Sequence, residues 1–311
     1  MCQYPQACVT ALALAALGFA CLTDSVVPPT FDGHRALQCL NRQVSFGPRV
    51  PGSEAWRQCR EYYTTYFDSL GLSVDSQAFD FVDPYSGATI PLVNLRVIIE
   101  GQDPHQPGLL LAAHWDSRPR TDLAVDRSLA ALPIDGANDG ASGVAVLMEL
   151  AGLLAAQPPP VKVELLLLDG EDWGRAGHVD YYLLGSREFA RRGIRGKYRF
   201  AIVLDMVGDK DQQIYREGYS EEYHPELNDM VFDLAKELNI TTFHDSVKHH
   251  VLDDHLPLNG GGVPAINLID FDYPYWHTEL DTPDKCSAES LENVGKLTTN
   301  IIYNSSLWPK N

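Results

Sequence analysis

Five short segments of this 311-residue chain carry histidine and carboxylate side chains, which are the ligand types of catalytic zinc. Each segment lies at or just after the end of an apolar run. Ligands spread over five segments indicate an enzyme site with one open metal position rather than a compact zinc finger. The segments are His114-Trp-Asp116, Asn138-Asp139-Gly140, Asp169-Gly-Glu171-Asp172, Asp205-Met-Val-Gly208 and Trp276-His277-Thr278.

The apolar runs ahead of these segments are short, rich in Val, Ile and Leu, and typical of buried strands. The runs are 109–113, 161–168, 200–204 and 263–269. Between them, 143–156 is apolar nearly all round and predicts a buried helix, and 228–238 has helical spacing. The alternation predicts an α/β domain whose mixed, largely parallel central sheet is flanked by helices. The carboxyl ends of its strands would gather the five segments in one pocket.

Length and charge limit the organisation of the chain. The candidate ligands run from His114 to His277, so a domain boundary between them would divide the site. We therefore predict one zinc-dependent catalytic domain over 28–311, preceded by a separate N-terminal segment, 1–27. The net charge of −18 argues against a nucleic-acid partner, whose phosphates require a basic face.

The N-terminal segment resembles an export signal. Residues 9–20 are apolar, too few to span a bilayer, and fit the core of a signal peptide. Gly18-Phe-Ala-Cys21 resembles a bacterial lipoprotein cleavage site with Cys21 as the lipidated residue, although no Lys or Arg precedes the core and Phe19 is bulky. We expect export to the periplasm, the cell envelope or the extracellular space, with a membrane tether through Cys21 as one option. The alternative is an N-terminus that is unprocessed, disordered or helical.

None of the six cysteines shows CxxC spacing, so a Cys-ligated zinc is rejected. Cys39 and Cys59 lie in two predicted helical stretches that could pack together, and an exported protein could bridge them. Cys286 would then have no partner, and buried free thiols are the alternative for all three.

The individual side chains suggest separate roles. Asp116 points the same way as His114 on an extended segment and is placed to orient it. Asp139 lies in a glycine-rich turn before the buried helix, as a metal ligand, a helix N-cap or both. Glu171 and Asp172 are neighbours on a turn, so that one can bind the metal and the other serve as general base.

Two further strings complete the set. Asp205 ends the run 200–204, a good position for another carboxylate ligand. His277 follows Trp276, whose ring would form a pocket wall beside the metal. A solvated acidic turn and a packed histidine are the alternatives when either string is considered alone.

The order of the motifs HxD, NDGASG, DxED, LDMVG, DDHxP and WHT resembles the zinc-dependent aminopeptidase superfamily, which includes the animal-type glutaminyl cyclases. The sequence is most similar to the bacterial cyclases of that type. The resemblance covers about 31–304, including FGPRVPG at 46–52.

The resemblance implies two ligand sets. In the cyclases a single zinc is held by the residues matching Asp139, Asp172 and His277, and Glu171 takes the general acid/base role. In the aminopeptidases Asp139 would bridge two zincs, and the residues of the second site would be His114 and Asp205. All these residues are present, so the ligand inventory permits one metal or two.

Two features favour the cyclase. Asp253-Asp-His-Leu-Pro257 resembles the cyclase DDHxP segment. The resemblance implies a hydrogen-bond network and a shared proton between Asp253 and Asp205. Peptidases of the superfamily commonly have Ser at the position of Asp253. Trp276 matches the cyclase pocket, and Trp173 is a second candidate wall, with core packing as its alternative. One position differs from the animal cyclases: they carry His where this chain has Asn267.

The resemblance thus implies a glutaminyl-peptide cyclotransferase that converts N-terminal Gln of peptides or proteins to pyroglutamate and releases ammonia, with one zinc per chain. The alternative enzyme is a two-zinc aminopeptidase. A non-catalytic binding domain on the same fold would require a lost base or ligand, and none is missing.

Overall fold

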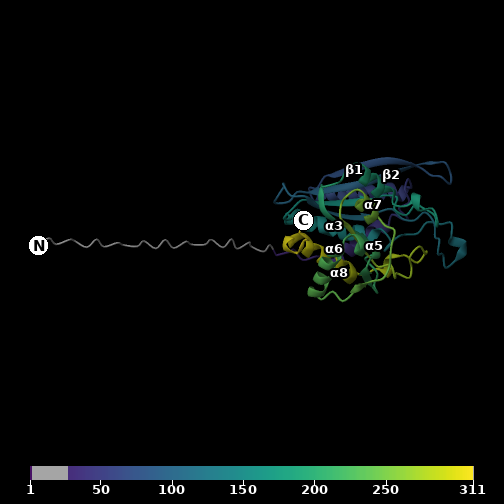
Figure 1. The fold of residues 1–311 in the computed structure, drawn as a ribbon. Helices are drawn as coiled ribbons and strands as arrows, with labels where there is room; N and C mark the ends of the chain where they lie inside the picture. Colours follow the sequence, from purple (N-terminus) through teal and green to yellow (C-terminus); the bar gives the residue numbers. More distant parts are fainter. Residues whose placement is uncertain (2–26, 311) are drawn as a thin grey trace.

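A six-stranded mixed sheet forms the centre of the protein (Figure 1). The computed structural model describes residue 1 and residues 27–310. The strands lie in the order β1-β2-β4-β3-β5-β8. Neighbours among β4, β3, β5 and β8 pair in parallel. β2 pairs antiparallel with β4, and β1 pairs antiparallel with β2 at the edge of the sheet. The fold-class prediction of a mixed, largely parallel sheet is confirmed. The strands are β1 (Val74–Val82), β2 (Thr89–Ile99), β3 (Gly108–His114), β4 (Val163–Leu168), β5 (Tyr198–Asp205) and β8 (Ala265–Ile269).

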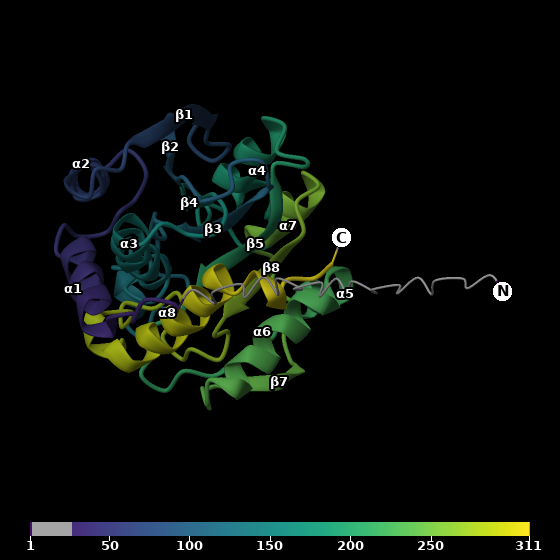
Figure 2. The ribbon, with the colours of Figure 1, turned by 90° about the vertical axis from the view of Figure 1, so that its left-hand side faces the viewer.

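Helices cover both faces of this sheet, as Figure 2 shows. On β3, Leu109, Leu111 and Ala113 belong to one apolar core, and Leu110 and Ala112 belong to another on the opposite face. Burial on both faces explains why the strands are continuous apolar runs without alternation. The first core contains α1 (Gly33–Val44), α2 (Glu54–Ser69), α3 (Ala141–Ala156) and α8 (Ala288–Tyr303); the second contains residues of α4 (Leu184–Arg191) and α7 (His255–Gly260).

The predicted buried helix is α3, which is buried along most of its length. A Cβ atom at Gly143 would lie 2.2 Å from the Leu204 carbonyl oxygen of β5, so glycine allows α3 to pack directly on the sheet. The N-cap residue is Gly140, and no side chain caps the helix. Asp139 therefore does not act as the N-cap, and its carboxylate is available for another role.

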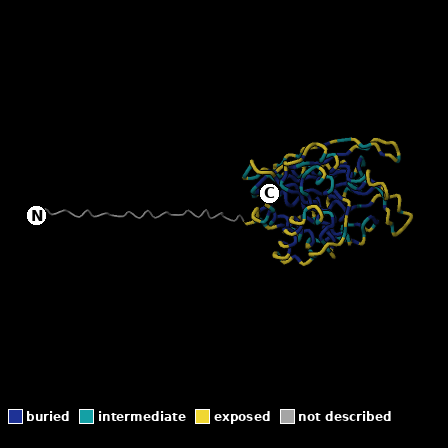
Figure 3. Tube along the Cα trace, in the orientation of Figure 1, coloured by how far each residue is buried: buried dark blue, intermediate teal, exposed yellow. Residues whose placement is uncertain are grey.

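A smaller unit lies beyond β8, where β6 (Ile214–Arg216) and β7 (Phe243–Val247) pair in parallel. Next to them are α5 (Gly218–Tyr223) and α6 (Pro225–Glu237), and α6 is the helix predicted over 228–238. Four short 3₁₀ helices complete the described secondary structure: Arg127–Leu129, Val179–Tyr181, Pro283–Lys285 and Ser305–Leu307. Figure 3 shows the buried residues gathered in the interior around the sheet.

The signal-like run 9–20 and Cys21 lie outside the described residues. Within 27–310, no helix is long and apolar enough to cross a membrane. Cys39, Cys59 and Cys286 are buried free thiols, so the bridge between Cys39 and Cys59 is not formed. The pKa of the Cys59 thiol is raised to about 11 by burial, which keeps it protonated and unreactive at neutral pH.

Candidate active site

The register of the parallel strands brings the sequence-predicted residues to one edge of the sheet. His114 at the end of β3 lies opposite Leu168 of β4, and Asp205 at the end of β5 lies opposite Ile269 of β8. β3 lies between β4 and β5, so the chain continues to one side of β3 and then returns to the other. Such a reversal at the carboxyl ends of parallel strands is where α/β folds form their binding crevices.

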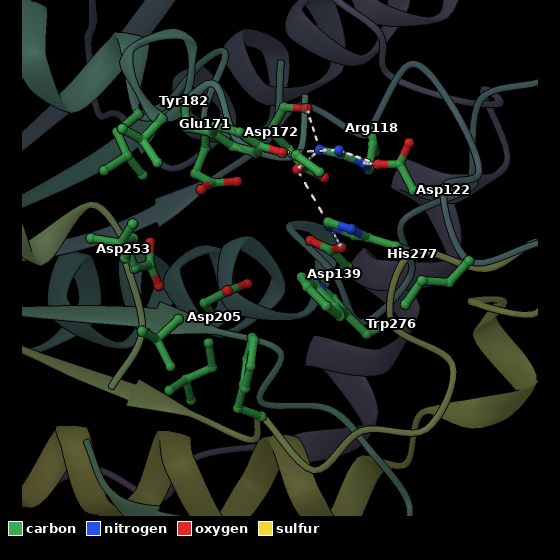
Figure 4. A pocket seen from close by; sticks show the side chains of 18 of the residues that line it. Arg118, Asp122, Asp139, Glu171, Asp172, Tyr182, Asp205, Asp253, Trp276 and His277 are labelled. Atoms are coloured by element: carbon green, nitrogen blue, oxygen red, sulfur yellow. Dashed lines mark hydrogen bonds and ion pairs between the residues drawn. The ribbon is translucent and has the colours of Figure 1, made fainter. Parts of the chain in front are cut away.

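A cavity of about 520 Å³ opens at this edge. Figure 4 shows Glu171, Asp205 and Asp253 on one side of it, and the Asp139, Asp172 and His277 cluster on the other. Its lining also includes Trp276, Phe271 and several aliphatic side chains. The cavity thus combines a small set of converging polar groups with apolar walls, as small-molecule sites usually do.

The first candidate metal cluster is formed by Asp139, Asp172 and His277, whose ligand atoms lie within 4.8 Å of one another. His277 Nε2 is 3.4 Å from Asp172 Oδ1 and 3.7 Å from Asp139 Oδ2. The Oδ2 atoms of both aspartates are buried and lack a hydrogen-bond partner. Buried carboxylate oxygens are rarely left unpaired, so these three residues fit a divalent cation with one open position.

The second candidate cluster shares Asp139 with the first. Nε2 of His114 lies 3.2 Å from Oδ1 of Asp139 and 3.2 Å from Oδ1 of Asp205. Burial alone would lower the pKa of His114, but its contacts with Asp116, Asp139 and Asp205 outweigh burial and raise that pKa well above its ordinary value. The geometry therefore accommodates either one ion or two ions bridged by Asp139.

Asp116 connects the two halves of the site. Its Oδ1 lies 3.5 Å from Nδ1 of His114, on the side of the ring that faces away from Asp205. The same carboxylate accepts hydrogen bonds from the backbone N–H groups of Glu171 at 3.2 Å and Asp172 at 3.3 Å. One buried side chain thus orients both the histidine after β3 and the acidic turn after β4.

The turn that carries Asp139 depends on the glycine after it. Gly140 has a φ of +83°, and a Cβ atom there would lie 2.8 Å from Cε1 of His114. The carboxylate of Asp281 accepts the backbone N–H groups of Asn138 at 2.8 Å and Asp139 at 3.1 Å. Sequence reasoning missed Asp281, because 142 residues separate it from Asp139 and no local pattern marks the contact.

The two neighbouring acids of the turn after β4 have opposite pKa shifts. Burial, reinforced by the charges of Asp172 and Asp253, raises the pKa of Glu171 well above its ordinary value. Burial would also raise the pKa of Asp172, but His277 and Arg118 together lower it. Adjacent carboxyl groups with separated pKa values suit different tasks, a proton carrier and an ionised ligand.

Arg118 is a functional candidate that sequence reasoning did not identify. Its side chain is 1% exposed, and its guanidinium donates to the Asp172 carboxylate, the Asp122 carboxylate and the Tyr182 hydroxyl. The contact with Asp172 fixes the orientation of that carboxylate next to His277. In the sequence, Arg118 has no feature that distinguishes it from a surface arginine.

Asp253 also lines the cavity, but its contacts differ from the expectation. Its Oδ2 accepts a 2.6 Å hydrogen bond from Nδ2 of Asn267, whereas Asp205 bonds to His114. Asp205 thus pairs with His114, and Asp253 pairs with the Asn267 amide. A proton shared between the two carboxyl groups stays a prediction. The two acids remain linked through their charges: burial, with a further contribution from Asp253, raises the pKa of Asp205 to about 7.

The two tryptophans occupy different places. The Trp276 ring stacks on His277 with 3.9 Å between ring centroids and packs against Phe271, in the cavity wall. Trp173 lies outside the cavity lining, and its Nε1 donates to Asp83 at 3.2 Å. The expectation that Trp173 forms a pocket wall is wrong, because the turn after Asp172 directs the ring toward the β1–β2 connection.

Known proteins with the same architecture include both cyclases and peptidases. A glutaminyl-peptide cyclotransferase of Gloydius blomhoffii is 26% identical over 288 residues, which cover 80% of this chain and 74% of that protein. The aminopeptidase YwaD of Bacillus subtilis is 27% identical over 218 residues, which cover 64% of this chain and 41% of that protein. The crystal structure of a Bacteroides thetaiotaomicron glutaminyl cyclase bound to N-acetylhistamine has a TM-score of 0.84 and 34% identity, and the match covers 90% of this chain and all of that one.

The model of peptidase family M28 matches residues 94–302, which include both candidate metal clusters and the acids that face them. This range extends from β2 to the end of α8 and contains every strand that contributes to the cavity. The chain therefore belongs to peptidase family M28.

Proposed function

We propose that this M28-family protein is a glutaminyl-peptide cyclotransferase, which closes the N-terminal Gln of peptides or proteins to pyroglutamate and releases ammonia. The observation that carries the proposal is the set of three carboxyl groups, Glu171, Asp205 and Asp253, facing one cavity beside the first metal cluster. Cyclisation moves a proton from the α-amine to the leaving amide nitrogen and consumes no water. The cyclotransferase match, which spans more of this chain than the aminopeptidase match, supports the same reading.

The ligands for one zinc would be Asp139, Asp172 and His277, whose donor atoms and unpaired carboxylate oxygens fit such an ion. A zinc bound there supplies a Lewis acid for the side-chain amide carbonyl of the substrate. Arg118 keeps Asp172 ionised and oriented for this role. Trp276, stacked on His277, covers the cluster with an apolar ring and excludes water that would otherwise hydrolyse the amide.

Glu171 would accept the proton of the attacking α-amine and return it to the leaving nitrogen. Its raised pKa suits both steps, because the carboxyl can hold the proton between them at near-neutral pH. Asp205 has a pKa of about 7 and can present a neutral carboxyl that donates a hydrogen bond to the tetrahedral species. Asp253, fixed by Asn267, completes the polar wall. Positioning the amine against the amide supplies a further part of the rate.

The test is the identity of the product. The purified protein is incubated with a peptide that begins with Gln and with its counterpart that begins with Ala, and the products are identified by mass spectrometry. We expect loss of ammonia from the Gln peptide only, with every peptide bond intact. Release of the first amino acid from either peptide would contradict the proposal.

A two-zinc aminopeptidase is the second candidate, and one observation favours it. His114, Asp139 and Asp205 form a second donor cluster of suitable geometry. In that case Glu171 would activate water for hydrolysis. Two measurements separate the candidates: the zinc content by elemental analysis and the rate of cleavage of an amino-acid anilide. One zinc per chain without anilide cleavage supports the cyclase. Two zincs per chain with cleavage support the peptidase.

A further inference from the structure

A second, shallower groove lies next to the cavity. It has a volume of about 660 Å³ and runs between α4 and α7, which lie side by side in Figure 2. Leu183, Arg187 and Leu252 line both the cavity and the groove. The two hollows are therefore neighbours that share these side chains, so a peptide that leaves the cavity past Arg187 lies next to the groove.

The groove is basic on a strongly acidic protein. Between residues 187 and 199 the chain carries six basic residues and one acidic residue, whereas its net charge is −18. Two of the six, Arg187 and Arg191, line the groove, and the opposite wall is apolar, with Leu252, Leu256 and Pro257. The one acid, Glu188, is only 13% exposed and pairs with Arg191 and Arg192, so it offsets only part of this charge.

Arg187 is held in place without a carboxylate partner. Its Nε donates to the Tyr182 carbonyl at 3.1 Å, and its Nη2 donates to the Val179 carbonyl at 3.3 Å. Neither carbonyl neutralises the guanidinium, and within residues 27–310 no carboxylate forms an ion pair with it. The side chain is thus oriented at the junction of cavity and groove, with its positive charge still available to a ligand.

We propose that the groove is an extended subsite that binds acidic side chains of the peptide substrate downstream of the Gln in the cavity. This inference rests on the proposed function for the identity of the first residue. An extended peptide advances about 3.3 Å per residue, so successive residues pass Arg187 and then Arg191. The apolar wall accommodates the aliphatic parts of their side chains. The enzyme would therefore prefer N-terminal Gln peptides that carry Glu or Asp after the first few residues.

The test compares two peptides that share their first two residues and differ only in three following Glu or three following Gln residues. We expect kcat/KM for the acidic peptide to be about 3–10-fold higher at low salt, the size that one or two part-exposed ion pairs support. The preference should decrease as salt rises, because the groove is open to solvent. The readout is the kcat/KM of the acidic peptide divided by that of the neutral peptide. A general loss of activity in a variant lowers both values and cancels in this ratio.

Variants locate the effect. Arg187→Gln combined with Arg191→Gln should abolish the preference for the acidic peptide, and Arg191→Glu alone should lower it, because Arg187 keeps its positive charge at the groove. Arg192→Gln is the matched control, because Arg192 pairs with the same Glu188 but does not line the groove; it should keep the preference. An equal kcat/KM for both peptides in the wild-type protein, or a preference that survives the double change, would overturn the subsite.

Failure of the subsite and failure of the proposed function give different results. Gln amide is too short to reach the groove, so its cyclisation tests the reaction alone. Binding of the same two peptides, labelled with a fluorophore, to the Glu171→Gln variant measures the groove without turnover. Tighter binding of the acidic peptide that disappears when both arginines are also replaced supports the subsite, whichever reaction the enzyme catalyses. Equal dissociation constants for the two peptides refute it.

Discussion

The side-chain amide of Asn267 donates a 2.6 Å hydrogen bond to the carboxylate of Asp253, and both groups are buried. Asn267 is on β8, and Asp253 lies in the segment before α7. The Asp254 backbone N–H donates to the other oxygen of Asp253, so the two contacts together fix the orientation of this carboxylate. The hydrogen bond from Asn267 also gives a role to the position at which this chain differs from the animal cyclases.

Replacing Asn267 with Leu should lower kcat by about 10–100-fold, because a hydrogen bond to a buried charged group contributes about 1.5–3 kcal/mol. Zinc content should be unchanged, because Asn267 contacts none of the metal ligands. Asn267→His restores an N–H donor and should recover part of the activity. Steady-state kinetics of the two variants provide the measurement, and equal activity of Asn267→Leu and wild type would remove Asn267 from the mechanism.

Replacing Asp172 or His277 with Ala should remove the metal and abolish activity, because each is one of three donors in the first cluster. Elemental analysis after dialysis measures the loss. Asp122→Asn is the control, because Asp122 contacts Arg118 but lies outside both donor clusters. Full metal content in either Ala variant would show that the ligands have been assigned incorrectly.

Replacing Glu171 with Gln keeps the shape of the side chain but removes its ability to carry a proton. We expect kcat to fall by about 10²–10⁴-fold, the usual contribution of a positioned acid or base. The metal should stay bound, since Glu171 belongs to neither donor cluster. A variant that loses zinc would mean that Glu171 and Asp172 have exchanged roles.

The variants His114→Ala and Asp205→Ala report on the second cluster. In a cyclase with one zinc, both should retain that ion, and Asp205→Ala should lose most activity because the neutral carboxyl near pH 7 is gone. Zinc stoichiometry by mass spectrometry under native conditions gives the count. Two ions in the wild type, with one lost in each variant, would establish the aminopeptidase instead.

A prediction about stability concerns Glu149, far from the site. Glu149 is buried on α3 beside Arg35, with 3.1 Å between Oε2 and Nε. Burial raises its pKa to about 7, and Arg35 opposes that shift. The folded pKa is above the unfolded value of 4.5, so the folded state is favoured below that value and loses stability as pH rises through about 7.

The neutral variant Glu149→Gln should therefore be more stable than wild type at pH 8 by about 1–3 kcal/mol, with the difference vanishing near pH 5. Denaturant unfolding of both proteins at pH 5 and pH 8 measures this difference in the free energy of unfolding. The pH dependence of all other groups is common to the two proteins and cancels. Arg35→Gln should show the opposite trend, because it removes the compensating charge. A pH-independent difference would indicate a packing effect alone.

The central strands and the candidate metal ligands were predictable because they have local patterns. β3, β4, β5 and β8 are apolar on both faces, and the candidate ligands Asp172 and Asp205 lie at or just after the ends of such runs, whereas Asp139 lies in a glycine-rich turn before α3. The antiparallel strands β1 and β2 were not predicted. One face of β1 is largely exposed, and its sequence has no continuous apolar run. The direction of Trp173 was mispredicted because a turn residue can face either side, and the sequence does not show which.

The contacts that orient the ligands were beyond sequence reasoning. Arg118 reaches Asp172 across 54 positions of the chain, and Asn138 reaches Asp281 across 143. Such pairs are set by the packing of loops from different strands. The sequence could identify the candidate metal ligands that the structure brings together, but not the residues that hold them in position.

The double role of Asp116 separates the residues of the reaction centre from those that form the outer walls of the site. Because one carboxylate contacts both His114 and the Glu171–Asp172 turn, the candidate ligands and the proposed proton carrier are oriented by the same side chain. The walls contributed by α4 and α7 make none of these contacts. Substitutions of the side chains that line the groove on α4 and α7 can therefore change the peptide preference while the contacts of Asp116 stay as they are.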